Sequence, residues 1–405
     1  MVFLQNILGL VVSLGICFLL SWNRKSIPWK TVIKAIIAEF IIAFIIVKIP
    51  LGAKILTVVS NGITRLLNCG ADGLDFVFGS LWTGDAGYIF IIQSLGGVIF
   101  VSSLVAVLYY LGVIGFIVKW IGKAVGKLMG TTEVESFVAV ANMFLGHTDS
   151  PILVAKYLND LTDSEIFVIL VSGMGSMSAS ILIGYTSLGI KMEHLLIASA
   201  LVPIGSIMVS KIVCPQIDTP KNIGGVKMDN KGNNGNVIDA LSEGANTGIQ
   251  MVIAIGASLV GFVGMVAVID LFLGFLPGNI TLSNIFGYIF APFGWLLGFE
   301  GEEIMLAGRM LGDKLILNEF IAYGTLGAQM NAGTISETSA LIATISLAGF
   351  ANLSSMGMCV GGIGVLCPEK RPVISKLVFK ATLAGVLVSI NSALIVSIVS
   401  RIPIL

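Results

Sequence analysis

The chain has 405 residues, of which 56% are hydrophobic and only 11% are charged, and its mean hydropathy is +0.98. This balance excludes an ordinary soluble domain and predicts a polytopic membrane protein, in which the 48 glycines would let helices pack closely. The formal net charge is zero, so no nucleic-acid partner is expected, and the five cysteines lack the paired spacing of a zinc site or a disulfide framework.

The first apolar segment, residues 3–22, has neither the charged flank nor the small-residue cleavage site of a signal peptide, so we expect it to remain as a membrane span. Arg24, Lys25 and Lys30 follow it, and positive charge marks the cytoplasmic side of a membrane. The N-terminus is therefore placed outside, and a second span, residues 31–49, returns outward.

Residues 51–81 carry polar side chains at helical spacing between apolar ones, which predicts one or two amphipathic helices at the membrane interface. The apolar run that follows, residues 88–118, is too long for one straight span, so we expect it to be tilted or to begin outside the bilayer. Lys119, Lys123 and Lys127 place its end in the cytoplasm.

A polar, helix-breaking stretch, Gly146–Pro151, lies between two apolar segments that are too short to span. The segment before it, residues 131–145, has about 15 residues where a span needs roughly 20, and the segment after it ends at Asn159. A polar stretch at membrane depth needs protein or water around it, so it is a candidate functional site. The pattern predicts a re-entrant hairpin open to the cytoplasm; the alternative is an ordinary loop between two spans.

Residues 163–185 form a span that is interrupted between Ser172 and Ser180, where four serines and two glycines weaken the helix and free backbone carbonyls for a cation. The alternative is that these small residues only allow tight packing. An intact span, residues 195–213, follows. The lysine-containing segment after it, with Asn230–Gly235, predicts a flexible cytoplasmic linker.

The same order of elements returns in the second half of the chain. A polar helix that starts at Asn236 leads into an apolar span ending near Phe275, and a charged stretch between Phe299 and Glu319 then interrupts the apolar pattern. Residues 338–364 form a span that is broken at Gly349–Ser355. A last span, residues 377–402, follows a cytoplasmic loop and ends outside, so both termini are placed outside.

A polar hairpin, an interrupted span and an intact span thus occur twice, with opposite orientation. Such an inverted repeat predicts a secondary transporter, whose broken helices meet near the membrane midplane and form the substrate site. The sequence therefore predicts an all-α polytopic membrane protein with about eight transmembrane helices, two opposed re-entrant hairpins, interfacial helices and an inverted-repeat transport core. No Walker-type loop is present, so ATP hydrolysis is not expected.

This reading divides the chain into four parts. The predicted parts are residues 1–128, with the first scaffold spans and interfacial helices; residues 129–235, with the first hairpin, the first core repeat and the linker; residues 236–298, with a long scaffold span and an interfacial helix; and residues 299–405, with the second hairpin and the second core repeat.

Six segments, which cover nearly the whole chain in order, resemble signature segments of the concentrative nucleoside transporter family. They are Phe76-Val-Phe-Gly79, Val98-Ile-Phe-Val-Ser-Ser-Leu104, Gly146-His-Thr-Asp-x-Pro151, Asn236 to Gly256, Asn318-Glu-Phe-Ile-Ala-Tyr323 and Gly349-Phe-Ala-Asn-Leu-Ser-Ser355. The resemblance implies a nucleoside symporter of the bacterial cytoplasmic membrane that needs no cofactor and is coupled to Na⁺. It also implies a homotrimer in which the hairpin-bearing domain moves like an elevator against a stationary scaffold.

The resemblance further implies the residues that bind substrate and cation. The nucleoside positions are Gly146, His147, Thr148 and Asp149 at the first hairpin tip, Ile181 and Phe350 against the base, and Glu319, Asn352 and Ser355 at the ribose. The Na⁺ positions are the Asn142 side chain, the Leu145 carbonyl, the Ser176 hydroxyl and the Met177 carbonyl.

The chemistry of these residue types agrees with the implied roles. A carboxylate such as Glu319 accepts from two adjacent ribose hydroxyls at once, although it could instead pair with Lys314 or Arg309. Asn352 could simply bridge two helices. Neutral oxygens such as that of Asn142 favour Na⁺, and coupling to H⁺ is the alternative.

Two residues depart from the family pattern, which usually has Gln and Glu where this chain has His147 and Asp149. The preferred nucleobase therefore stays open, and His147 could fill the hairpin tip without touching substrate. An intramembrane hydrolase that uses His147, Asp149 and a serine is a rival, but the chain has no Gly-x-Ser-x-Gly nucleophile turn. A channel is a second rival, which two opposed hairpins would block.

Overall fold

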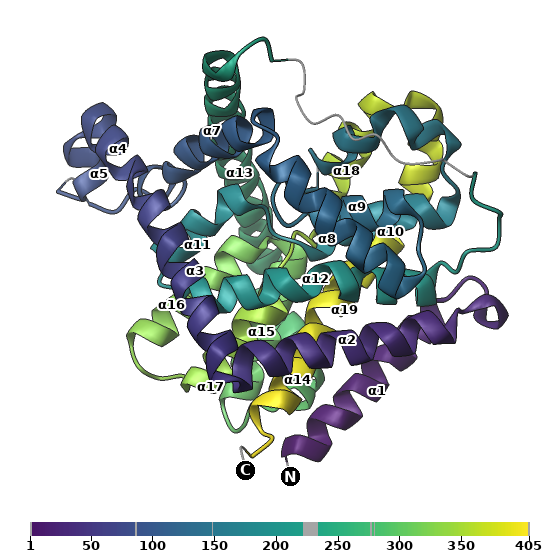
Figure 1. Ribbon diagram of the computed structural model, residues 1–405. Coiled ribbons are helices and arrows are strands. Elements are labelled where there is room, and N and C mark those ends of the chain that lie inside the picture. The colour runs from purple at the N-terminus through teal and green to yellow at the C-terminus, as the bar shows by residue number, and fades with distance from the viewer. Residues whose placement is uncertain are drawn as a thin grey trace.

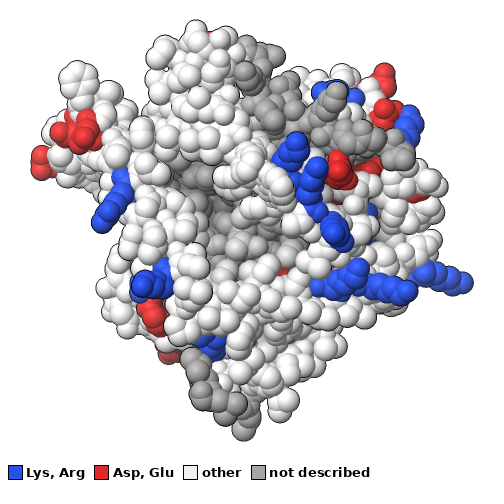
Figure 2. Space-filling view, in the orientation of Figure 1, with Lys and Arg blue, Asp and Glu red and all other residues white. Residues whose placement is uncertain are grey.

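The computed structural model describes residues 2–85, 87–147, 149–221, 234–275, 278 and 280–403, and all regular elements within these ranges are helices (Figure 1). Six helical stretches in this described part are long and apolar enough to cross a membrane. They are Val2–Leu20, Phe90–Tyr110, Asp163–Ser187, Met192–Val213, Val237–Leu273 and Pro368–Ser400. Most of the face in Figure 2 is uncharged. The structure is thus that of an all-helical membrane protein.

The first two helices, α1 (Val2–Leu20) and α2 (Trp29–Lys48), pack on helices from the other end of the chain. Their main partners are α12 (Met192–Val213) and α19 (Arg371–Ser400). Asn6 of α1 donates to the Leu296 carbonyl at 2.9 Å and accepts from the Ser397 hydroxyl at 2.9 Å. These buried polar contacts fix α1 against α14 (Leu282–Leu297) and α19, because an amide in hydrocarbon needs partners.

The predicted amphipathic segment is present as α3 (Pro50–Asn68), α4 (Gly70–Phe78) and α5 (Ser80–Thr83). The long apolar run after it is not one tilted span. It divides into α6 (Phe90–Gln93), α7 (Gly97–Tyr110) and α8 (Val113–Met129). The chain turns between α7 and α8 at Gly112, whose φ of +79° is a left-handed conformation that glycine adopts without strain.

Helix α7 packs along the longest helix, α13 (Val237–Leu273), through glycines. A Cβ atom at Gly244 would lie 2.6 Å from the Ser103 Cα atom, and one at Gly248 would lie 2.6 Å from the Ile99 Cα atom. The two backbones therefore approach as closely as small residues allow, which is a common way to join helices in a membrane. Outside this contact α13 is mostly exposed.

The first predicted hairpin consists of α9 (Glu133–Ala141) and η2 (Ser150–Asp160), which pack side by side. The interrupted span after it is α10 (Asp163–Gly175), an extended stretch at residues 176–178, η3 (Ala179–Ile181) and α11 (Leu182–Ser187). The linker predicted at Asn230–Gly235 lies largely outside the described residues.

The second half has α15 (Glu303–Ile316) and α16 (Glu319–Asn331) at its charged stretch, then α17 (Glu337–Leu347) and α18 (Leu353–Leu366) on either side of a break. A short η4 (Pro368–Lys370) leads into α19. The last span therefore starts earlier than predicted. Lys376 and Lys380 lie on its first turns, not in a loop, and Lys380 places its ammonium 5.0 Å from the centre of the Trp22 ring.

The two breaks in α10/η3 and α17/α18 are in contact. A Cβ atom at Gly349, whose φ is +94°, would lie 2.6 Å from the carbonyl carbon of Gly175. Gly349 therefore requires backbone without a side chain, and this non-helical residue touches the last residue of α10. Gly175 and Gly349 are 174 residues apart in the sequence (349 − 175), so their contact depends on the tertiary structure.

Candidate functional site

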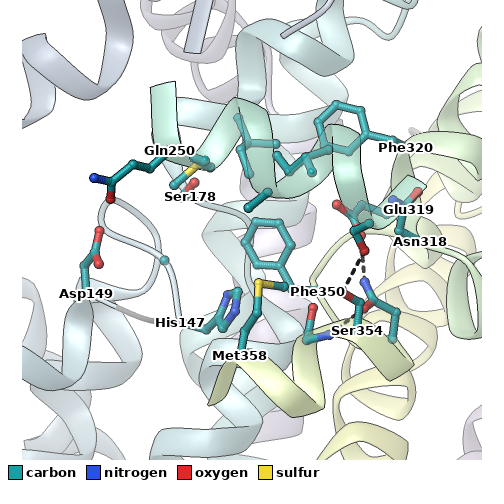
Figure 3. Close-up of a pocket in the computed structure, with 18 of the residues that line it drawn as sticks. His147, Asp149, Ser178, Gln250, Asn318, Glu319, Phe320, Phe350, Ser354 and Met358 are labelled. Atoms are coloured by element: carbon teal, nitrogen blue, oxygen red, sulfur yellow. Dashed lines mark hydrogen bonds between the residues drawn. The ribbon is translucent and has the colours of Figure 1, made fainter. Parts of the chain in front are cut away.

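A cavity of about 320 Å³ lies where the two breaks, both hairpin tips and α13 meet (Figure 3). Among the predicted binding residues, its wall includes Gly146, His147, Asp149, Ile181, Glu319, Phe350, Asn352 and Ser355. Thr148 lies outside the described residues. The structure thus brings together, from five separate elements, side chains that the sequence could only propose one at a time.

Glu319 forms the charged end of the cavity. It is the first residue of α16, it is only 3% exposed, and its neighbour Asn318 caps the helix by accepting from the Ile321 N–H at 3.2 Å. The positive end of a helix dipole favours a carboxylate at this position.

Two side chains hold the Glu319 carboxylate in place. The Tyr185 hydroxyl donates to Oε1 at 3.0 Å, and the Asn352 amide donates to Oε2 at 3.0 Å. Each carboxylate oxygen can accept a second hydrogen bond, so the group keeps acceptor capacity for a ligand in the cavity.

The predicted alternative, an ion pair of Glu319 with Lys314 or Arg309, is wrong. The ion pairs within the described residues are Lys191–Glu337, Lys211–Glu135 and Lys221–Asp160. Asn352 does join two elements, because its Oδ1 atom caps α18 by accepting from the Ser355 N–H at 2.8 Å while its amide donates to Glu319. It bridges helices and also lines the cavity.

The middle of the cavity is apolar and its far end is polar again. The apolar residues Ile181, Met251, Phe350 and Met358 line the cavity, and Figure 3 shows Phe350 between Glu319 and His147. The His147 ring lies beside the Phe350 ring with centroids 5.0 Å apart. Figure 3 shows His147 and Asp149 on the side away from Glu319. A ligand with a polar part at each end and a flat apolar body would match this order.

Three buried polar atoms on the cavity wall have no hydrogen-bond partner among the described residues. They are His147 Nε2, Ser178 Oγ and Ser355 Oγ. Buried polar groups in native proteins are nearly always satisfied, so such atoms at a cavity indicate that a ligand or water completes them. The His147 Nε2 atom is thus available to bond a molecule in the cavity.

The hydrolase alternative fails on the same contacts. The Ser150 hydroxyl donates to Asn142 Oδ1 at 2.6 Å, and the His147 Nε2 atom accepts from no serine in the described residues. A nucleophilic serine needs a base within hydrogen-bond reach. The described residues also hold no cluster of His, Cys, Asp and Glu that could bind a catalytic metal.

Helix α13 contributes a wall that the sequence analysis did not assign to the site. Its cavity-lining residues are Thr247, Gln250, Met251, Ala254, Ile255 and Ser258. Thr247, Gln250 and Ser258 recur at helical spacing within an otherwise apolar span, which is the signal that could have identified this face. The Ser258 hydroxyl lies 2.9 Å from that of Ser354, so α13 also contacts α18 here.

The predicted cation-binding residues lie mostly behind the cavity wall. Asn142 is fully buried and donates to the Ser172 hydroxyl at 2.9 Å, and the Ser176 hydroxyl donates to the Gly173 carbonyl at 3.2 Å. The Ala179 N–H donates to the Phe144 carbonyl at 3.2 Å, which joins the hairpin tip to the break after α10. Leu145 lines the cavity, whereas Asn142, Ser176 and Met177 do not.

The chemistry of this set fits a monovalent hard cation. Its members offer neutral oxygens from side chains and unwound backbone, without a carboxylate, at the negative end of α10. Asn142 Oδ1 already accepts from Ser150 and retains a second lone pair.

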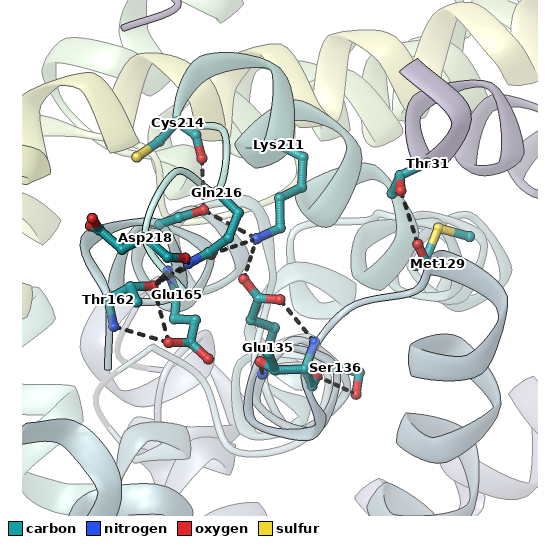
Figure 4. Close-up of polar contacts among 12 residues, drawn as sticks. Thr31, Met129, Glu135, Ser136, Thr162, Glu165, Lys211, Cys214, Gln216 and Asp218 are labelled. Carbon is teal, nitrogen blue, oxygen red and sulfur yellow. Dashed lines mark hydrogen bonds and ion pairs between the residues drawn. The ribbon is translucent and has the colours of Figure 1, made fainter. Parts of the chain in front are cut away.

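The base of the first hairpin is held by a buried ion pair (Figure 4). The Lys211 ammonium at the end of α12 pairs with Glu135 of α9 and donates to the Ser164 hydroxyl of α10 at 3.1 Å. Glu135 also accepts from the Thr132 N–H at 3.1 Å in a capping box. One ammonium thus connects the starts of α9 and α10 to the end of α12.

Comparison with known proteins finds relatives over most of the chain. Family models described as Na⁺ dependent nucleoside transporter N-terminus, nucleoside recognition, and Na⁺ dependent nucleoside transporter C-terminus match residues 8–81, 91–192 and 194–397. The chain is 34% identical to the nucleoside permease NupC of Helicobacter pylori, covering 95% of this chain and 96% of that protein. It is 33% identical to the putative nucleoside permease NupX of Escherichia coli, covering 97% of each.

Among solved structures the chain is similar to CNTnw in an inward-facing substrate-bound state, with a TM-score of 0.94 and 35% identity over 99% of this chain and 98% of that one. An outward-facing state of a CNTnw variant gives the same TM-score of 0.94 at 34% identity and covers both chains completely. The fold is therefore shared as a whole, and the likeness does not favour one direction of opening.

The Lys211 contacts give a stability prediction. Lys211→Met should lower the free energy of unfolding by about 3–5 kcal/mol, because it leaves the Glu135 carboxylate buried without its partner. Adding Glu135→Gln should recover much of this loss, since no buried charge is then unpaired. Thermal unfolding of the purified protein in detergent measures both effects.

The matched control is Lys221→Met, which breaks the exposed pair with Asp160 and should cost less than about 1 kcal/mol. Equal losses from Lys211→Met and Lys221→Met would contradict a special role for the buried pair.

Proposed function

Because the chain belongs to the concentrative nucleoside transporter family, it is a multi-pass nucleoside permease and not an enzyme, and we propose that it imports nucleosides by symport with Na⁺. The observation that carries the proposal is the buried Glu319 carboxylate, which Tyr185 and Asn352 fix at one end of an otherwise apolar cavity. Its free acceptor sites suit the adjacent hydroxyls of a ribose. The cavity volume lies at the small end of the usual range for small-ligand sites, roughly 300–1,000 Å³.

In the proposed binding mode the ribose lies against Glu319, Asn352 and Ser355. The base lies between Ile181 and Phe350 and reaches the first hairpin tip, where Gly146, His147, Thr148 and Asp149 would contact its edge. Support comes from the Ser355 Oγ and His147 Nε2 atoms, which lack partners at the two ends of the cavity. An imidazole offers one donor and one acceptor to a base edge.

Sodium would bind beside this site, at the Asn142 side chain, the Leu145 and Met177 carbonyls and the Ser176 hydroxyl. A cation there would connect the hairpin tip to the break after α10, and the same hairpin tip contacts the substrate. Each ligand would then favour the backbone arrangement that the other requires, which is a reciprocal coupling of their affinities.

We also propose the finer architecture that the family resemblance implies: about eight spans, two opposed re-entrant hairpins and an inverted repeat that moves as an elevator. The contact between the breaks at Gly175 and Gly349 supports the repeat. The separate packing of α7 on α13 supports a scaffold against which the hairpins move. Assembly as a homotrimer would cover part of the exposed apolar surface of α13.

Uptake into proteoliposomes tests this function. Labelled uridine or adenosine should accumulate saturably above its external concentration when Na⁺ is high outside, and not when choline replaces Na⁺. Accumulation driven only by an inward proton gradient would establish H⁺ coupling instead. Uptake that stops when the internal nucleoside concentration equals the external one would contradict symport altogether.

The ribose assignment predicts a strong effect of Glu319→Gln. A hydrogen bond to a charged acceptor contributes about 1.5–3 kcal/mol, so the loss of this charge should weaken nucleoside binding roughly 10- to 150-fold. Competition against labelled uridine in the same vesicles measures this, and free nucleobases should compete poorly with the wild type. The control is Glu302→Gln on the exposed start of the same hairpin, which should leave uptake unchanged.

Gln250 of α13 provides a prediction about base preference. Figure 3 shows it on the same side of the cavity as Asp149, where the base edge would lie. Its amide can either donate or accept, whereas Gln250→Glu leaves only acceptors. The variant should therefore shift preference toward cytidine and adenosine, which carry amino groups, and against uridine by about tenfold.

The matched control for this prediction is Asn246→Asp, the same change from amide to acid one turn earlier on α13 and outside the cavity. It should leave the cytidine-to-uridine uptake ratio unchanged. An unaltered ratio in Gln250→Glu would show that α13 does not contact the base.

A further inference from the structure

Lys314 is a fully buried cation that the proposed transport site does not use. It lies in the last turn of α15 with 0% of its surface exposed. Its ammonium donates to the Ser346 carbonyl at 3.1 Å, the Ala348 carbonyl at 2.7 Å and the Ser389 hydroxyl at 2.8 Å. All three N–H donors are satisfied, and within the described residues no carboxylate forms an ion pair with it.

The acceptors of Lys314 are the carbonyls at the end of a half-helix. Helix α17 stops at Leu347, and Ala348 is extended, with φ −61° and ψ +145°. The last carbonyls of a helix have no intrahelical partner and carry its negative dipole end. In a membrane these groups need a partner, and here the ammonium of Lys314 supplies both hydrogen bonds and positive charge.

The other interrupted helix ends in the same way but without a charged side chain. Helix α10 stops at Gly175, and Ser176 is extended, with φ −100° and ψ +164°. Within the described residues no lysine or arginine hydrogen-bonds to this helix end. The side chain that reaches α10 from the preceding hairpin is the neutral Asn142, which donates to Ser172.

Each hairpin therefore contributes one side chain to the interrupted helix that follows it. One side chain at the C-terminal end of the first helix of each hairpin contacts the interrupted helix that follows. Asn142, directly after α9, donates to the Ser172 hydroxyl of α10, and Lys314 of α15 donates to carbonyls at the end of α17. The breaks themselves touch at Gly175 and Gly349. The proposed Na⁺ site lies between the first hairpin tip and the first break, and an ammonium lies at the second break.

We infer that the Lys314 ammonium is a tethered cation, which occupies at the second break the place that Na⁺ from solution takes at the first. This inference rests on the proposed function for the position of the Na⁺ site. One break would need an ion for its carbonyls to be satisfied, and so would be sensitive to the Na⁺ gradient. At the other break, the covalently attached ammonium of Lys314 would satisfy the carbonyls whether or not Na⁺ is present.

Lys314 acts in this account as a positioning residue for the nucleoside. It holds the Ala348 carbonyl, and the next residues along the chain include Phe350 and Asn352 on the cavity wall. Asn352 in turn donates to Glu319. Loss of the ammonium would leave the carbonyls of the break without hydrogen-bond donors. Phe350 and Asn352 would then no longer be held in place against the ligand.

Chemical rescue tests the inference without transport. Lys314→Ala should lower the Tm of the purified protein in detergent, measured without nucleoside and at constant ionic strength. Methylammonium should restore part of that Tm in a saturable way, because it fits the space left by the side chain and donates hydrogen bonds. Tetramethylammonium, which has no N–H donor, should restore nothing.

Nucleoside binding to the same samples provides a second readout. Binding to Lys314→Ala should be about tenfold weaker than to the wild type and should recover with methylammonium. The wild type and the control Lys191→Ala, which loses an exposed lysine, should not respond to methylammonium. A Lys314→Ala variant whose Tm and binding ignore methylammonium would overturn the inference.

If Lys314→Ala cannot be purified, a comparison of Lys314→Arg with Lys314→Met tests whether the charge at this position is required. The arginine variant keeps the charge and should fold and bind nucleoside, whereas the methionine variant has similar bulk without charge and should lose both. A Lys314→Met protein with wild-type Tm and nucleoside affinity would overturn the inference. Absence of Na⁺-driven uptake would count against the proposed function alone, because the rescue of Tm needs no Na⁺ gradient.

Discussion

The structure depends on one constraint: helix ends that lie inside a bilayer must find partners for their backbone carbonyls and N–H groups. In the described part of the chain, side chains next to the helix ends and one from a distant helix satisfy these groups. Asn352 caps the start of α18, Asn318 caps the start of α16, and Lys314 binds the end of α17. The polar groups that this requires are also the ones that line or support the cavity.

A ligand site follows from the same constraint. Carbonyls and N–H groups that are exposed by a break are oriented dipoles in a medium of low dielectric, where they interact strongly with charged and polar ligands. The cavity therefore combines a fixed carboxylate, a neutral polar end and an apolar middle within a volume suited to one small molecule. Because the hairpin tip, the breaks and α13 each supply part of the wall, relative movement of these parts would change the site.

The tightness of contact differs among the parts of the molecule. The breaks cross at glycines, α7 meets α13 at glycines, and Lys211 joins the starts of α9 and α10 to α12. In contrast, α13 is otherwise exposed and reaches the core mainly through the cavity wall and the Ser258–Ser354 contact. Helix α13 is therefore held mainly by α7 and by these contacts at the cavity.

The sequence by itself determined the membrane class, the hairpin with Gly146–Pro151 and both broken spans, because glycine, proline and polar residues act locally on helix formation. It did not reveal the turn at Gly112 within an apolar run, since membrane helices tolerate single glycines. Only the tertiary structure showed that Lys314 donates to the end of α17 and does not form an ion pair with Glu319. It also showed that Gln250 lines the cavity. Those contacts join residues far apart in the chain, and their partners are chosen by how helices pack, which no local pattern encodes.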